Sequence, residues 1–169
     1  MAAVPAPLVE RLTTHLDALS FVLARATPAA LEARPRPDEW SARENLAHLA
    51  RHHAVFLTRL RRLLSEDRPE LGRYRAEDDP DWVDWAGLPL ASVLERLRTL
   101  RAELLLLVRS LSPLDWARTG IHPTFGEMDV AGWLEFFLLH EAHHLYVALV
   151  RLGEAGRRPR SRAGGGPTA

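Results

Sequence analysis

Residues 40–49 read Trp-Ser-Ala-Arg-Glu-Asn-Leu-Ala-His-Leu, and they open a long helical pattern. Ser41 and Glu44 have the spacing of a capping box, in which the Ser hydroxyl accepts a hydrogen bond from a free backbone N–H and the Glu carboxylate reaches back to the cap residue. From this start, residues of one stripe recur every three or four positions, at Leu46, Leu49, His53, Leu57, Leu60 and Leu64. This periodicity predicts an amphipathic helix over residues 41–64.

Three further segments show helical periodicity. They span about residues 7–26, 90–111 and 129–152, the last with Asp129 as its expected N-terminal cap and Gly153 as its expected C-terminal cap. Sustained alternation of apolar and polar residues is nearly missing, as are Asn-Gly and Asp-Gly hairpin turns between apolar runs. Four amphipathic helices without strands predict an all-α fold, an antiparallel four-helix bundle.

Two irregular connections, residues 65–89 and 113–128, separate these helices. The first carries an acidic stretch over residues 78–84, and loops of this length in a small domain are often functional. We therefore expect one domain over residues 1–153. The Arg/Gly/Pro-rich residues 154–169 are expected to form a disordered tail.

The composition excludes several classes of function. The 169 residues carry 22 basic and 22 acidic side chains, so no overall field favours nucleic acid or a membrane surface. Cysteine is absent, which excludes disulfides, thiolate nucleophiles and Cys-ligated zinc. The longest purely apolar run, residues 104–108, is far shorter than the roughly 20 residues that span a bilayer. The first residues, 1–7, are small and apolar but lack the basic segment of a signal peptide, so we expect no membrane association and a cytoplasmic location.

Residues 140–144 read His-Glu-Ala-His-His within the last predicted helix. His140 and His144 are four residues apart and therefore share one helix face. Trp133 and Phe137 lie in the same angular sector, which directs the two imidazoles into an apolar interior. Buried neutral imidazoles without a partner are costly, and a divalent metal ion would satisfy both. We predict that this pair binds metal.

The same string matches the His-Glu-x-x-His pattern of zinc proteases, in which the glutamate is the general base. Such enzymes take a third ligand downstream of the pair. Val147 and Val150 stand where the extended pattern has Gly and His, and the strands that accompany such sites are missing. We therefore reject the protease interpretation.

The third ligand is expected from upstream, where His48, His52 and His53 lie on the second predicted helix. Helical phase alone favours His53, which lies in the middle of the apolar stripe, whereas His48 lies towards its edge near His52. The pattern leaves this choice open. A core imidazole bonded to a backbone carbonyl is the ordinary alternative for the other histidines, His15, His52, His53, His122 and His143.

Two motifs resemble those of the DinB-like (DinB/YfiT) superfamily. The first is residues 40–49, and the second runs His-Pro-Thr-Phe-Gly-Glu-Met-Asp-Val-Ala-Gly-Trp-Leu over residues 122–134 and leads into the histidine string. The resemblance covers roughly residues 8–153. It implies an antiparallel bundle and a metal triad with one histidine eight residues after the motif Trp, which is His48, and two from the fourth helix, which are His140 and His144.

The resemblance also implies a metal-dependent enzyme, because characterised relatives include thiol-dependent S-transferases and isomerases, some of them linked to DNA damage. Three neutral imidazoles leave coordination positions open for a water or a substrate. Zn²⁺ or Ni²⁺ is the expected ion, and Mn²⁺ or Fe²⁺ is compatible with the same ligands. Thiol S-transfer and hydrolysis are the two expected reactions, on a small-molecule or thiol substrate. Residues 78–84 and His122 are candidates for the mouth of the site.

Two alternatives stay open. The bundle could hold a metal ion or a small ligand without turnover, or it could form a homodimer, as bundles of this size often do. One departure from the family concerns Val147, because many members carry Gln at the corresponding position and this chain lacks that polar neighbour.

Overall fold

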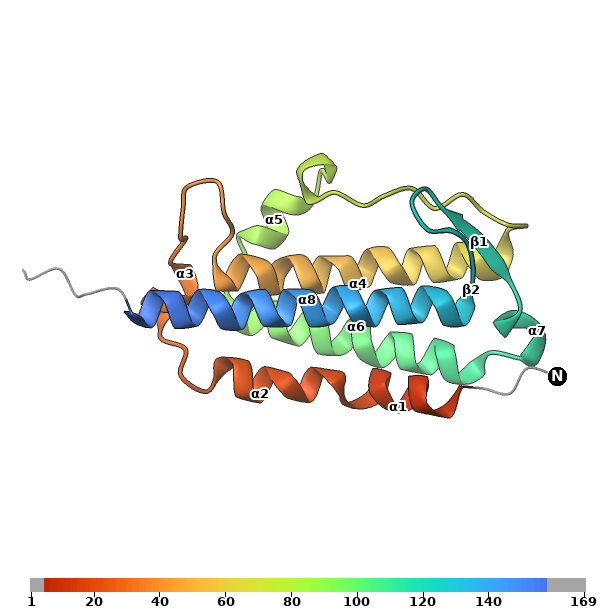
Figure 1. Cartoon of the computed structure of the whole chain (residues 1–169), viewed down its shortest axis with the longest axis horizontal. Coiled ribbons are helices and arrows are strands. Elements are labelled where there is room, and N and C mark those ends of the chain that lie inside the picture. The colour runs from red at the N-terminus through yellow and green to blue at the C-terminus, as the bar shows by residue number, and fades with distance from the viewer. Residues whose placement is uncertain (1–4, 158–169) are drawn as a thin grey trace, which may run out of the picture.

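The computed structural model describes residues 5–157 as a bundle of four long helical segments with short elements in the connections (Figure 1). The long segments are α1 (Ala6–Thr14) continued by η1 (His15–Asp17) and α2 (Ala18–Leu23), then α4 (Ala42–Ser65), α6 (Leu90–Ser110) and α8 (Val130–Arg157). The short elements are α3 (Pro28–Glu32), η2 (Ala76–Asp78), α5 (Trp82–Ala86), α7 (Pro113–Trp116), β1 (Thr119–His122) and β2 (Gly126–Asp129). The predicted all-α four-helix bundle is confirmed.

Successive long helices α4 and α6 run in the same direction, while α1–α2 and α8 run in the opposite one (Figure 1). The 24 residues of α4 span about 36 Å, so the chain must cover that distance again before α6 begins. The long connection over residues 66–89 makes this return along the outside of the bundle. The return is the physical reason for a loop of this length in a small domain.

The predicted N-terminal caps of α4 and α8 are present. Ser41 Oγ accepts a hydrogen bond from the Glu44 N–H at 3.2 Å, and Glu44 Oε2 accepts one from the Ser41 N–H at 2.8 Å. At the start of α8, Asp129 Oδ1 accepts a hydrogen bond from the Gly132 N–H at 2.8 Å. These local interactions fix where α4 and α8 begin, and so they set the phase of the histidines further along each helix.

The expectation of a fold without strands is wrong, because β1 and β2 form an antiparallel hairpin with His122 opposite Gly126. Gly126 adopts φ +72°, the left-handed conformation that closes a three-residue hairpin loop. A parallel bridge between Glu70 and Ile121 joins the hairpin to the return loop. Strands of four residues are too short to show the alternation on which sequence prediction depends.

Two helix boundaries also differ from expectation. The first helix is interrupted by the 3-10 turn η1, and α8 continues to Arg157, so Gly153 lies inside the helix and does not cap it. The first four residues of the expected tail, 154–157, are therefore helical, and residues 158–169 lie outside the described part of the chain. No helix within the described range is long and apolar enough to cross a membrane.

A layer of buried polar residues divides the hydrophobic core into two clusters. One cluster includes Leu12, Leu60 and Phe137, and the other includes Leu19, Leu46 and Leu145. Along α4, α6 and α8 the buried polar residues between the two clusters are His52, His53, Arg101, Glu141 and His144. Asn45 and His48 lie on α4 among the residues of the second cluster, next to this layer. Buried polar groups in a bundle need partners, so this layer is where a site is expected.

Candidate metal centre

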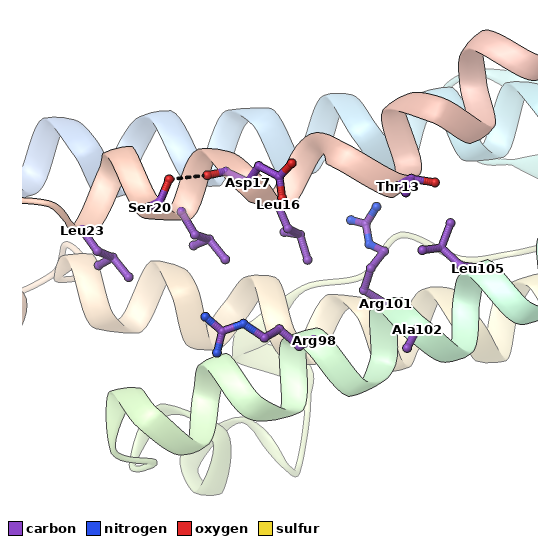
Figure 2. Close-up of a pocket in the computed structure, with 10 residues that line it drawn as sticks. Thr13, Leu16, Asp17, Ser20, Leu23, Arg98, Arg101, Ala102 and Leu105 are labelled. Carbon is purple, nitrogen blue, oxygen red and sulfur yellow. Dashed lines mark hydrogen bonds between the residues drawn. The ribbon is translucent and has the colours of Figure 1, made fainter.

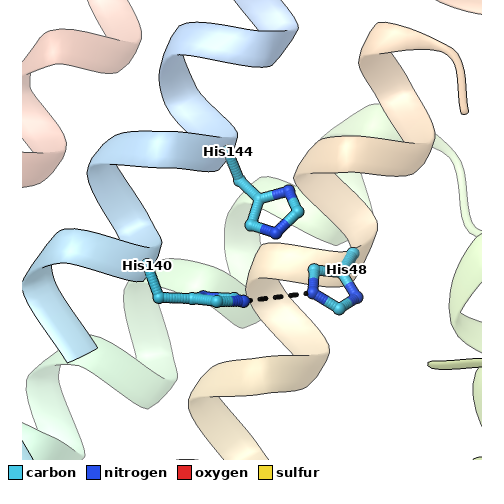
Figure 3. A group of neighbouring side chains, drawn as sticks. All are labelled: His48, His140 and His144. Atoms are coloured by element: carbon cyan, nitrogen blue, oxygen red, sulfur yellow. Dashed lines mark hydrogen bonds between the residues drawn. The ribbon is translucent and has the colours of Figure 1, made fainter. Parts of the chain in front are cut away.

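The structure brings His48 of α4 together with His140 and His144 of α8 (Figure 3). One ring nitrogen from each residue lies within 4.8 Å of the other two, and the Nε2 atoms of His48 and His140 are 3.3 Å apart. Two nitrogen ligands of one tetrahedral zinc ion, each 2.0–2.1 Å from it, would lie about 3.3 Å apart. The donor set and its spacing therefore fit a divalent metal ion.

All three imidazoles are neutral at pH 7. Burial, followed by repulsion from His144, lowers the pKa of His48 from 6.5 to about 3. Burial, followed by repulsion from His48, lowers the pKa of His140 to about 3, and burial and then repulsion from His140 do the same for His144. Neutral imidazole is the form that binds metal, so these histidines need not lose protons to bind it at pH 7.

Asn45 orients one of the three rings. Its Nδ2 donates a hydrogen bond to the Ser41 carbonyl oxygen at 2.9 Å, and its Oδ1 therefore accepts one from His144 Nδ1 at 3.1 Å. This leaves His144 Nε2 without a proton and free to bind metal. Nδ1 of His48 and Nδ1 of His140 are buried and have no hydrogen-bond partner within residues 5–157.

Aromatic side chains cover the α4 side of the triad. The rings of Trp40 and Tyr74 lie 4.8 Å and 5.6 Å from the ring of His48, and Trp82 lies 4.9 Å from Trp40. The ring of His52 stacks on His140 at 3.8 Å. The return loop thus contributes apolar surface, which keeps the imidazoles out of bulk water.

The acidic stretch 78–84 does not supply carboxylates to this site. Asp79 accepts hydrogen bonds from Arg51 at 2.6 and 2.9 Å and one from the Tyr74 hydroxyl at 2.8 Å. The contact with Arg51 holds the pKa of Asp79 below its usual value. The expectation that the acidic side chains of this stretch line the mouth of the site is wrong, because Asp79 and Asp81 pair with Arg51 on α4, while Trp82 packs inward against Trp40 and His48.

Glu141 lies on a different face of α8 from the triad, the face towards His15 and Arg101. It is fully buried and accepts hydrogen bonds from His15 Nδ1 at 2.7 Å and from Arg101 Nη2, and its Oε2 lies 3.1 Å from His53 Nε2. Burial would raise the pKa of Glu141, but the hydrogen bond from His15 and the charge of Arg101 lower it below its usual value. Glu141 is therefore an ion-pair partner inside the bundle, which agrees with our rejection of the protease interpretation.

His53, which helical phase favoured as the third ligand, belongs to that same network. Its Nδ1 donates a hydrogen bond to the Leu49 carbonyl oxygen at 2.8 Å, the ordinary arrangement for a core histidine in a helix. His15 also has a structural role, through Glu141. His143 is exposed, and in the described chain only His48, His140 and His144 form a group with metal-ligand spacing.

A cavity of 410 Å³ opens beside the triad. Its lining combines His140 and His144 with residues of the return loop, the hairpin and α4, namely His52, Arg59, Arg73, Tyr74, His122, Thr124, Phe125, Phe136 and His143. His122 lines this cavity as expected, and no carboxylate does. The open side of the triad therefore faces a space large enough for a small molecule.

Sequence reasoning missed Asn45, Tyr74 and Arg59. A signal for Asn45 was present, because it lies three residues before His48, on the same face, and Asn is an unfavourable residue inside a helix. Tyr74 carried no such signal, because its distance from the triad depends on the path of the return loop. Arg59 lies on α4, but the sequence did not show which face of that helix borders the cavity.

Comparison with known proteins agrees with this geometry. The model of the DinB superfamily matches residues 11–148. The protein named "Putative metal-dependent hydrolase OB0782" of Oceanobacillus iheyensis is 29% identical over 117 residues, which are 68% of this chain and 66% of that protein. A "Putative metal-dependent hydrolase" of Bacillus mycoides is 26% identical over 141 residues, 81% of each chain.

Two solved structures have the same fold. YfiT from Bacillus subtilis, described as "a probable metal-dependent hydrolase with an unusual four-helix bundle topology", matches with a TM-score of 0.72 and 21% identity over 88% of this chain and 85% of its own. The four-helix bundle protein TT2238 matches with a TM-score of 0.60 and 31% identity over 85% of this chain and 95% of its own. Because the family model covers most of the bundle and the histidine triad lies within it, the chain belongs to the DinB superfamily.

Proposed function

We propose that this protein is a metal-dependent enzyme that binds one divalent ion, Zn²⁺ or Ni²⁺, through His48, His140 and His144. The observation that supports it best is the combination of three neutral, convergent imidazoles with a cavity on their open side. When bound, the ion would act as a Lewis acid and lower the pKa of a water or thiol that reaches it.

The protein's own side chains would fix the site around the ion. Asn45 holds the His144 ring in one tautomer, and the stack of His52 on His140 limits rotation of that ring. Trp40 and Tyr74 exclude water from the α4 side. A rigid, dry set of ligands is the part of such catalysis that the protein supplies.

A site that only stores metal would be closed by a fourth protein ligand. Among the candidates, Glu141 and His53 are both bonded to Arg101. His52 stacks on His140 but lies outside the group of described residues with metal-ligand spacing. The arrangement therefore favours an open, catalytic site over a structural one.

Thiol S-transfer is the reaction that the cavity supports best. Its lining lacks the carboxylate base that water activation commonly uses. A thiol has a pKa of about 8.5 and reaches its reactive thiolate form far more easily than water loses a proton. With no cysteine in the chain, the thiol would come from a small-molecule substrate. Hydrolysis is the second candidate, and the names of the Oceanobacillus and Bacillus relatives favour it.

The first test is the metal content of untagged wild-type protein, measured by mass spectrometry beside His140→Ala and His143→Ala. We expect about one equivalent in the wild type and in His143→Ala, whose imidazole is exposed and outside the triad, and none in His140→Ala. Metal-loaded protein is then assayed with low-molecular-weight thiols and an electrophilic acceptor, and separately with activated esters. Wild-type protein that binds neither zinc nor nickel would refute the proposal.

A further inference from the structure

The cavity beside the triad has a positively charged wall. Arg59 and Arg73 line it together with the metal-centre residues His140 and His144. Arg59 follows His52 by seven residues on α4, which places both on the same helix face, towards the cavity. Both arginines lower the pKa of His122, after the larger effect of burial, which places their charges close to the cavity interior.

Arg59 is a buried cation without a counter-ion. Arg59 is only 9% exposed, and its Nη2 donates a hydrogen bond to the carbonyl oxygen of Gly72. None of the carboxylates in residues 5–157 pairs with it. The phenol of Tyr74 beside it is neutral at pH 7, because burial and the hydrogen bond to Asp79 raise its pKa. A buried guanidinium normally has a carboxylate or phosphate partner, since an unpaired buried charge is costly.

His122 adds a neutral donor to the same wall. Its Nδ1 accepts hydrogen bonds from the backbone N–H groups of Thr124 and Phe125, at 3.1 and 3.2 Å. Because Nδ1 is an acceptor, the ring proton must lie on Nε2. The hairpin turn thus presents a histidine N–H as a donor, next to the apolar rings of Phe125 and Phe136.

Another cavity shows what a paired arginine looks like in this protein. It has a volume of 640 Å³ and lies between the η1–α2 segment and α6, with Arg101 at its wall (Figure 2). The guanidinium of Arg101 is bonded to Glu141 and to the Leu12 carbonyl oxygen. That charge is neutralised inside the protein, whereas the charge of Arg59 is not.

We propose that the cavity beside the triad binds a carboxylate group of the substrate, with Arg59 as its buried counter-ion, His122 as a second donor and Arg73 at the mouth. This inference rests on the metal-dependent function proposed above. One buried guanidinium and one neutral donor match a single negative charge, and a fork of guanidinium N–H groups fits a planar carboxylate. The rings of Phe125 and Phe136 fit an apolar group next to that carboxylate.

The test uses a matched pair of small probes, 3-phenylpropionate and its uncharged amide, with inorganic phosphate as a third. Their dissociation constants are measured by calorimetry on zinc-loaded and metal-free protein. The variants are Arg59→Met, Arg59→Lys, Arg73→Met and the control Arg61→Met, whose exposed side chain pairs with Glu103 instead. Metal content and circular dichroism of each variant establish that the triad and the fold are intact.

We expect the wild type to bind the acid about tenfold or more tightly than the amide. That preference should disappear in Arg59→Met, persist in part in Arg59→Lys, fall less in Arg73→Met and be unchanged in Arg61→Met. If Arg59→Met does not fold, loss of part of the preference in the exposed Arg73→Met still supports the site, and an unchanged preference there opposes it.

Other outcomes overturn the inference. An acid preference that Arg59→Met retains would mean that the carboxylate binds elsewhere, including at the metal. Tighter binding of phosphate than of 3-phenylpropionate would mean that the site recognises a phosphate group and not a carboxylate. Failure of the proposed function gives a different result. Protein that takes up no metal but still prefers the acid through Arg59 would support the anion site and refute the metal centre.

Discussion

Lowering the pH should destabilise the metal-free protein through its histidine triad. His48, His140 and His144 have native pKa values of about 3, while the same side chains titrate near 6.5 when they are not buried. Between these values the unfolded chain binds more protons than the folded one, so stability is full above pH 6.5 and falls as the pH falls.

The size of the effect follows from these values. Between pH 7 and pH 5, each imidazole that stays neutral in the folded state and becomes charged in the unfolded state costs about 2 kcal/mol of stability. Three such histidines give about 6 kcal/mol, comparable to the total stability of an ordinary domain, about 5–15 kcal/mol. Replacing His140 by Gln removes one titrating group and should reduce the loss by about 2 kcal/mol.

Urea unfolding followed by circular dichroism, with a chelator present, measures this loss at pH 7 and pH 5. Tyr146→Phe is the control on the same helix, because its side chain is exposed and its replacement leaves every histidine in place, so the pH dependence should stay as in the wild type. If wild type and His140→Gln lose the same stability between the two pH values, burial does not hold His140 in its neutral form, and the electrostatic description of the site is wrong.

Three further changes test other parts of the structure. Asn45→Ala removes the acceptor of His144 Nδ1 and should weaken zinc binding by about 10–100-fold, measured by competition with a chromophoric chelator, while one equivalent still binds at saturation. Glu141→Gln removes the charge that neutralises the buried Arg101 and should cost about 3–5 kcal/mol in urea unfolding, with the metal content unchanged; equal stability would mean that the ion pair is not needed. Gly120→Ala places a Cβ 2.5 Å from a methyl group of Leu63 and 3.2 Å from the carbonyl oxygen of Pro69, and should cost about 1–3 kcal/mol, whereas Gly72→Ala, with nothing within 4 Å, should be nearly neutral.

Local sequence determined the parts of the fold that depend on neighbouring residues. The capping box of Ser41 and Glu44, the Asp129 cap and the spacing of three and four residues fixed where α4 and α8 begin, because these features act within one or two helical turns. The pairing of His140 with His144 was predictable for the same reason. The short strands and the extension of α8 beyond Gly153 were not, because they depend on contacts with distant segments.

The choice of His48 shows the limit of pattern reasoning. Helical phase correctly described His53 as the histidine nearest the middle of the buried stripe, but it could not say which buried side of α4 faces α8 and which faces α6. The resemblance to a family pointed to His48, and the structure places it with His140 and His144. Occupation of the triad by metal, the reaction and a homodimer stay predictions.

By itself the sequence determined that this protein is a helical bundle with two inward-facing histidines on its last helix, since both properties follow from local periodicity. Only the tertiary structure decided what surrounds them. The return loop brings Tyr74 and Trp82 over the triad, and the hairpin brings His122 opposite Arg59. These residues come from segments far apart in the chain, and their distances depend on the packing of the whole bundle rather than on any local pattern.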